Sequence, residues 1–102
     1  MVERPTITVV GSVNLDLVAT VASLPVAGET VTDAEFGQFP GGKGANQALA
    51  AARLGADVSL IACVGEDANA DEALVLLKEG GVDLSACVQH HTAPTGVALI
   101  SV

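Results

Sequence analysis

A glycine-rich turn leads directly into a helix of very small side chains at residues 40–55, PGGKGANQALAAARLG. From residue 44 to residue 54, every residue except Asn46, Gln47 and Arg53 is alanine, glycine or leucine. Alanine and leucine favour the helical backbone, and a face of such small side chains can pack closely on a sheet. Gly55 stands where a glycine commonly follows the end of a helix. The segment therefore predicts a helix that lies directly against a β-sheet.

The sheet and a second helix are predicted by the runs around this segment. Residues 6–12, TITVVGS, and residues 57–65, DVSLIACVG, are typical of strands that are buried on both faces. Residues 67–81, DANADEALVLLKEGG, predict a helix with acidic first turns, a lysine near its end and glycines beyond it. Residues 96–102, GVALISV, predict a last strand. Strands that alternate with helices indicate an α/β fold.

The residues between the first strand and the first helix do not fit a plain strand–helix–strand unit. Residues 17–25, LVATVASLP, continue extended until a turn. Residues 29–39, ETVTDAEFGQF, form a weaker and more polar strand candidate or pair, as expected of a sheet with one open face. We interpret these segments as an insertion, a small sheet that stands off the main layer.

Length and charge narrow the classes of function. The 102 residues form one small domain, residues 1–102, and 50% are hydrophobic, enough for a packed core. Twelve acidic residues against four basic ones argue against nucleic acid and anionic membranes as partners. Asn14 and Asp16 interrupt the apolar run near the N-terminus, and no basic segment precedes it, so a soluble cytoplasmic protein is expected. Cys63 and Cys87 lack a CxxC spacing and are interpreted as small buried hydrophobes in a reducing cytosol.

Asn14 and Asp16 are the first candidates for chemistry, in GSVNLDL just past the first strand. If the backbone stays extended, residues two apart point to one side, so both polar groups face the same space. An amide and a carboxylate at fixed positions can hold the vicinal hydroxyls of a sugar, and ligands of open α/β sheets bind at the carboxyl ends of strands. The alternative is an Asx turn that leaves the strand.

The turn GGKGAN is the second candidate. Its glycines allow backbone N–H groups to approach a ligand closely, and the helix that begins here points its free N–H groups at the same place. Lys43 and Asn46 are three apart and can share a face of the first turn. The alternative is an ordinary glycine-rich start of a helix, which accounts for the glycines but not for the lysine. Neither the phosphate-binding GxxxxGK[ST] loop nor the GxGxxG dinucleotide fingerprint is present.

Other polar residues are interpreted as structural. His90 and His91 are adjacent, with no Cys/His/Asp spacing nearby to complete a metal site, and are expected in a solvated loop. The acidic residues at the start of the second helix are expected to interact with its dipole rather than to bind a cation. They are Glu66, Asp67, Asp71 and Glu72.

Five stretches, taken in order, resemble the N-terminal part of ribokinases, within the PfkB family of sugar kinases. They are GSVNLD, PVAGETV, GGKGANQALAAARLGADV, ACVGEDANADEAL and TGVALI, and together they span nearly all of the chain. The GGxxxN pattern is typical of the PfkB family in general. The lysine of GGKG and the NQA that follows favour ribokinase over fructokinase, adenosine kinase or ketodeoxygluconate kinase.

The resemblance implies a ribokinase-like α/β fold, a site and a reaction. Residues about 15–39 and 95–102 would form a small β-sheet lid that closes over the sugar, and ribokinase lids pack together into a homodimer. The parent enzyme would use ATP, with Mg²⁺ and a monovalent cation, to phosphorylate the 5-hydroxyl of D-ribose. The implied substrate-binding residues are Asn14, Asp16, Gly42, Lys43, Gly44 and Asn46.

The chain also departs from the ribokinase pattern. Ribokinases are considerably longer, and their DTxGAGD-like motif, which carries the catalytic base and the anion hole, does not occur in residues 1–102. No catalytic or metal-binding residue is therefore expected in this chain, and the chain alone is expected to be inactive as a kinase. Two other hypotheses are a non-catalytic sugar-binding or assembly module and a PfkB kinase for another sugar or a nucleoside. A parallel sheet of so few strands would expose an unpaired edge and an apolar face.

Overall fold

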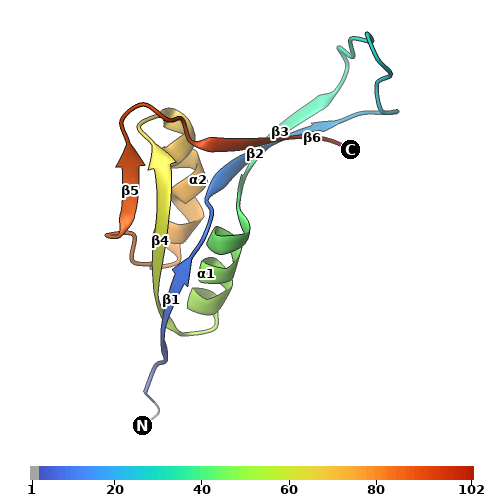
Figure 1. Cartoon of the computed structure of the whole chain (residues 1–102). Coiled ribbons are helices and arrows are strands. Elements are labelled where there is room, and N and C mark those ends of the chain that lie inside the picture. Colours follow the sequence, from blue (N-terminus) through green and yellow to red (C-terminus); the bar gives the residue numbers. More distant parts are fainter. Residues whose placement is uncertain (1–2) are drawn as a thin grey trace.

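A computed structural model describes residues 3–102 as an elongated molecule, 59 × 33 × 18 Å along its principal axes (Figure 1). Its helices and strands occur in the order β1 (Thr6–Val10), β2 (Asn14–Thr20), β3 (Glu35–Gly41), α1 (Lys43–Arg53), β4 (Asp57–Gly65), α2 (Ala68–Glu79), β5 (Cys87–His90) and β6 (Gly96–Ser101). The strands form two separate sheets of three strands each. The mixed helix and strand content confirms the α/β fold class.

The core sheet has the strand order β1-β4-β5, with all strands parallel. Its register pairs Val9 with Leu60 and Cys63 with Val88. Helices α1 and α2 both contact β4 (Figure 1), and the side chains between them and the sheet form the hydrophobic core. Leu60 of β4 and Leu15 of β2 are its largest fully buried side chains.

The prediction that residues 6–12 and 57–65 are buried on both faces is wrong. Buried residues of β4 alternate with more exposed ones such as Ile61, which is 43% exposed. In β1, Val9 packs against the core, whereas Val10 is 75% exposed. Side chains of a strand alternate between faces, and the buried ones here all lie on the face that the helices cover. The other face has no covering layer within the described residues.

Part of that uncovered face of the core sheet is apolar and one edge is unpaired, as expected, although Thr8 and Ser59 also face outward there. β1 is an edge strand, because its pairing partner in the sheet is β4 alone. The register places the outward-facing residues of the three strands next to one another. They include Val10, Ile61, Cys63 and Val88.

The two cysteines differ from the sequence interpretation in one respect. Cys63 is exposed on the uncovered face, so its interpretation as a buried hydrophobe is wrong, whereas Cys87 is partly buried against the core. Cys87 pairs in register with Ala62, the residue next to Cys63, so the two thiols point to opposite faces of the sheet and both are free. Burial raises the pKa of the Cys87 thiol, which disfavours the reactive thiolate.

The outer sheet has the strand order β3-β2-β6 and extends away from the core sheet (Figure 1). β2 pairs antiparallel with β3 and parallel with β6. The prediction of a small sheet that stands off the main layer is confirmed, although the bounds differ. The first strand of this sheet begins at Asn14, and residues 29–34, predicted as extended, belong to a loop that connects β2 to β3.

Both helices lie where the sequence predicts them. Gly55, after α1, has φ +102°, and Gly81, after α2, has φ +79°, conformations that glycine adopts without strain. Asp67 caps α2, because its side chain accepts a hydrogen bond from the amide of Ala70. The short strand β5 was not predicted, and His90 is its last residue rather than part of a loop.

Candidate functional site

Asn14 and Asp16 lie on the same face of β2, as their spacing predicts. The Asn14 side-chain amide donates a hydrogen bond of 2.6 Å to Oδ1 of Asp16. Both residues are partly buried and both lie within the strand, so the alternative of an Asx turn does not hold. The pair leaves a second carboxylate oxygen and the amide oxygen available to other groups.

Gly41 of β3 forms the neighbouring surface. It pairs in register with Asn14, and the Asp16 carboxylate lies over its Cα. A Cβ atom at this position would lie 2.7 Å from both carboxylate oxygens of Asp16. A glycine is therefore required here for the carboxylate to keep this position.

The glycines of the turn that follows allow α1 to begin directly against the end of β1. Gly42 has φ +100°, and a Cβ at this residue would collide with the carbonyl oxygen of Ser12. A Cβ at Gly44, which is buried, would lie 2.6 Å from Cα of Gly11. The Ser12 carbonyl also accepts a 3.0 Å hydrogen bond from the amide of Ala45. Close backbone packing thus accounts for the glycines, as the simpler interpretation of this turn proposes.

Lys43 and Asn46 are not accounted for by that packing. Both are exposed in the first turn of α1, three residues apart. Lys43 comes two residues after Gly41, the partner of Asn14, so the chain carries it to the same end of the outer sheet. Neither of the ion pairs formed within residues 3–102, Arg4–Asp57 and His91–Glu66, involves this lysine.

The polar cluster is defined here as Asn14, Asp16, Lys43 and Asn46. Its two parts adjoin at Gly41, which pairs with Asn14 and leads into the first turn of α1. The structure brings Asn14 and Asp16 together and places the turn that begins at Gly42 beside them. Backbone atoms of Gly11 and Ser12 cover Gly44. A carboxylate accepts hydrogen bonds, an ammonium group donates them, and a side-chain amide does either. Together these groups match the hydroxyl groups of a polyhydroxylated molecule. The cluster can bind and orient such a molecule.

A second polar network, which the sequence analysis did not identify, lies at the carboxyl end of β4. The Thr95 hydroxyl donates to Oδ1 of Asp67 at 2.6 Å, and the Thr95 amide donates to Oδ2 at 2.9 Å. The same hydroxyl accepts a 2.9 Å bond from the amide of Gly65. The sequence does not indicate this network, because a single threonine before a strand is common and does not reveal its hydrogen-bond partners.

The neighbouring charged residues complete this region. Glu66 pairs with His91 at 2.9 Å, and both side chains are exposed. Nδ1 of His90 accepts a 2.8 Å hydrogen bond from the amide of Ala93. The interpretation of Asp67 as part of an acidic helix start is confirmed, and Glu66 has an ion-pair partner in addition.

Acid is expected to weaken the fold through Asp67. Hydrogen bonds from the side chain and the backbone of Thr95 hold the pKa of the Asp67 carboxyl below its ordinary value of 3.8, against an opposing effect of desolvation. The stabilisation is therefore complete above pH 3.8 and is lost as the pH falls from 3.8 through the lower folded-state pKa. The free energy of unfolding in urea should fall less between about pH 5 and about pH 3 in Asp67→Asn than in the wild type. Equal losses in both proteins would contradict this assignment.

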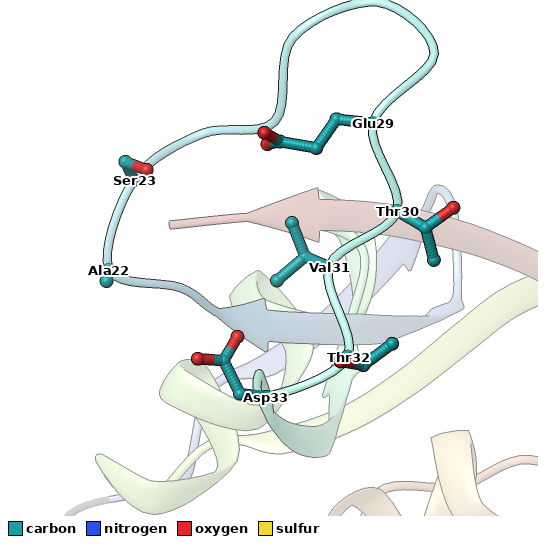
Figure 2. Close-up of a pocket in the computed structure, with 7 residues that line it drawn as sticks. All are labelled: Ala22, Ser23, Glu29, Thr30, Val31, Thr32 and Asp33. Atoms are coloured by element: carbon teal, nitrogen blue, oxygen red, sulfur yellow. The ribbon is translucent and has the colours of Figure 1, made fainter.

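A cavity of about 400 Å³ lies elsewhere, in the loop that connects β2 to β3 (Figure 2). The loop forms an open arch, with Glu29 and Val31 pointing inward and Thr30 pointing away (Figure 2). It is at the end of the outer sheet opposite to Asn14, which begins β2. The cavity is lined by Ala22, Ser23, Glu29, Thr30, Val31, Thr32 and Asp33.

The described residues also bear on metal and membrane binding. Within the described part of the chain, no three His, Cys, Asp or Glu side chains gather closely enough to hold a metal ion. Neither helix in residues 3–102 is long and apolar enough to cross a membrane.

Comparison with known proteins identifies the family. The model of the pfkB family of carbohydrate kinases matches residues 4–102. The chain belongs to the pfkB family. The ribokinase of Bacillus subtilis is 53% identical over 76 residues, covering 74% of this pfkB chain and 26% of its own length. The ribokinase of Haemophilus influenzae is 41% identical over 99 residues, covering 97% of this chain and 32% of its own.

Solved structures of the family confirm the ribokinase-like fold. The structure of Arabidopsis thaliana ribokinase complexed with ribose and ATP matches this pfkB chain with a TM-score of 0.85 and 34% identity. The match covers 98% of this chain and 32% of that protein. The chain thus spans about a third of the length of such relatives, and the resemblance to ribokinases extends over nearly all of it.

Proposed function

We propose that this chain supplies the sugar-binding and lid part of a ribokinase-type kinase, which transfers the γ-phosphoryl group of ATP to the 5-hydroxyl of D-ribose. The observation that carries the proposal is the Asn14–Asp16 pair, bonded at 2.6 Å on one face of β2 beside the start of α1. Its support is the likeness to ribokinases, among them a solved structure complexed with ribose and ATP.

The proposed site binds and orients the sugar. Asp16 accepts hydrogen bonds from ribose hydroxyls through the carboxylate oxygen that Asn14 leaves free, and Asn14 contributes its own amide oxygen. Lys43 and Asn46 donate from the first turn of α1, and Gly42 allows the backbone to approach. Fixing the 5-hydroxyl relative to the phosphoryl group is a large part of catalysis in kinases, because phosphoryl transfer depends mainly on positioning and electrostatics.

The outer sheet is proposed to act as the lid. It carries Asn14 and Asp16 on one face and extends beyond the core, so closure over bound sugar would exclude water and limit wasteful hydrolysis of ATP. Its exposed apolar side chains, such as Leu99 (82%) and Phe36 (64%), are available for pairing with a second copy. We therefore propose a homodimer through the lid strands.

Phosphoryl transfer itself requires groups beyond residues 1–102. The site residues named here position a hydroxyl, and none is proposed as the catalytic base. The base, the ATP pocket and the sites for Mg²⁺ and the monovalent cation are proposed to belong to a further part of a longer protein, since the chain spans about a third of its relatives. A cytoplasmic location stays a prediction.

Substrate preference tests the proposal. In the longer protein that it requires, kcat/KM is expected to be higher for ribose than for fructose or adenosine, and the isolated 102-residue chain should phosphorylate none of them. A preference for fructose or adenosine would assign the site to a different pfkB substrate. Ribose phosphorylation by the pure chain would show that the catalytic groups lie within it. A natural protein that has the intact mass of residues 1–102 and binds ribose without phosphorylating it would favour a non-catalytic module.

A further inference from the structure

Thr95 is the one polar or charged residue among residues 3–102 that is buried, with 3% exposure. Its hydroxyl donates to one Asp67 oxygen and accepts from the amide of Gly65, and its own amide donates to the other Asp67 oxygen. A fully satisfied buried network of this kind holds its members in one arrangement. Together, Gly65, Asp67 and Thr95 are called the junction network below.

The junction network joins three elements. Gly65 is the last residue of β4 in the core sheet, Asp67 caps α2, and Thr95 directly precedes β6 of the outer sheet. The fit is close, because a Cβ at Gly65 would lie 2.6 Å from the amide nitrogen of Thr95 and 2.8 Å from the carbonyl oxygen of Ala93. In Figure 1 the chain that leads from β5 to β6 passes beside the upper ends of β4 and α2.

The strand that follows the junction network borders the proposed sugar site. Gly96, the residue after Thr95, pairs in register with Asn14, and Ala98 pairs with Asp16. β6 is an edge strand, and its one partner in the outer sheet is β2. It is connected to the core in two ways, through its pairing with β2 and, at its start, through the junction network.

We infer that Asp67 and Thr95 are positioning residues, which set β6 against β2 and thereby hold Asn14 and Asp16 at the end of the core sheet. The effect on the sugar rests on the proposed function, whereas the effect on β6 does not. Asp67 has a second role, because it also caps α2 through the 2.9 Å bond from the amide of Ala70. The two roles share Oδ1, which accepts from Ala70 and from the Thr95 hydroxyl, but only Thr95 uses Oδ2. A side chain with a single oxygen can therefore keep the cap while it loses a contact with Thr95.

Hydrogen exchange in the 102-residue chain separates these roles. Asp67→Ser keeps one oxygen for the cap, and Thr95→Val keeps the branched shape but removes the hydroxyl. In both variants the β6 amides paired with β2, and the Val102 amide that donates to Ala19, should exchange about tenfold faster, relative to the amides of β4 and α2. Thr95→Ser keeps the hydroxyl, so its β6 exchange rates should stay within about twofold of those of the wild type.

Asp83 provides a matched control. Its carboxylate accepts a 2.9 Å hydrogen bond from the amide of Ser85. Asp83 bridges to Ser59 near the start of β4, whereas the junction network lies at the end of β4. Asp83→Asn should leave the relative protection of β6 unchanged. The inference would be overturned if β6 amide exchange were unchanged in Thr95→Val, or if protection fell equally in β4, α2 and β6. It would also be overturned if β6 exchanged as fast in Thr95→Ser as in Thr95→Val.

Ribose binding to the same variants supplies the second measurement. Asp67→Ser and Thr95→Val are expected to raise the Kd for ribose about tenfold by calorimetry, with Thr95→Ser near the wild-type value. Failure of the wild type to bind ribose would count against the proposed function, and the exchange of β6 would still decide the inference. Selective loosening of β6 with unchanged ribose affinity would overturn the link from β6 to the sugar site.

Discussion

Asp16→Ala in the longer kinase is expected to lower kcat/KM for ribose by about 100-fold or more. Hydrogen bonds to a charged group contribute about 1.5–3 kcal/mol each, and each 1.4 kcal/mol corresponds to about tenfold. Asp16 is proposed to accept from ribose through the oxygen not bonded to Asn14, and the truncation also leaves the Asn14 amide without its 2.6 Å partner. Steady-state kinetics with ribose as the varied substrate measures the effect.

Asp33→Ala is the matched control for that experiment. Asp33 is an exposed carboxylate in the β2–β3 loop, where it lines the arch of Figure 2. Asp33→Ala removes the same charge from the loop that connects two strands of the same sheet, so any general effect of lower negative charge should appear in both variants. Asp33→Ala should leave KM and kcat for ribose unchanged. Unchanged kinetics in Asp16→Ala would show that the sugar site has been assigned wrongly.

Gly44→Ala is expected to destabilise the chain by about 3 kcal/mol. The added Cβ would lie 2.6 Å from Cα and 2.7 Å from the carbonyl carbon of Gly11. Because both of these atoms belong to backbone, no side-chain rotation can relieve the contact, and the start of α1 must move away from the end of β1. Urea unfolding followed by circular dichroism measures the loss.

Gly28→Ala separates this steric effect from the general cost of replacing glycine. Gly28 has φ +80° in the outer loop, and a Cβ there would meet nothing within 4 Å. Only backbone strain is expected, about 1 kcal/mol. A loss in Gly44→Ala no larger than that in Gly28→Ala would contradict the close packing of α1 on Gly11.

The positions of the helices could be predicted because their signals are local. Alanine-rich sequence sets α1, and the acidic start with glycines beyond the end sets α2, so neither depends on distant contacts. Burial could not be predicted in the same way. The β-branched composition of β1 and β4 indicates a strand but does not reveal that both helices lie on one face of the sheet, which leaves Val10 and Ile61 exposed.

The candidate site was predictable in part for a similar reason. The period of an extended strand places Asn14 and Asp16 on one face, and the structure confirms this geometry. The sugar-binding role of these residues and of the turn at Lys43 stays a prediction. The junction network was not predictable, because Thr95 and Asp67 are 28 residues apart and their contact depends on how β6 leaves the core sheet.

The most direct test of the sugar site is a titration of the 102-residue chain with D-ribose, followed through the NMR signals of the Asn14 side-chain amide. Asn14 donates to Asp16 in the structure, so ribose bound at this pair must change the surroundings of that amide. We expect a saturable shift of this signal and of the Gly41 amide signal, lost in Asp16→Ala and retained in Asp33→Ala. Saturable binding of ribose that leaves both signals unmoved would contradict this expectation.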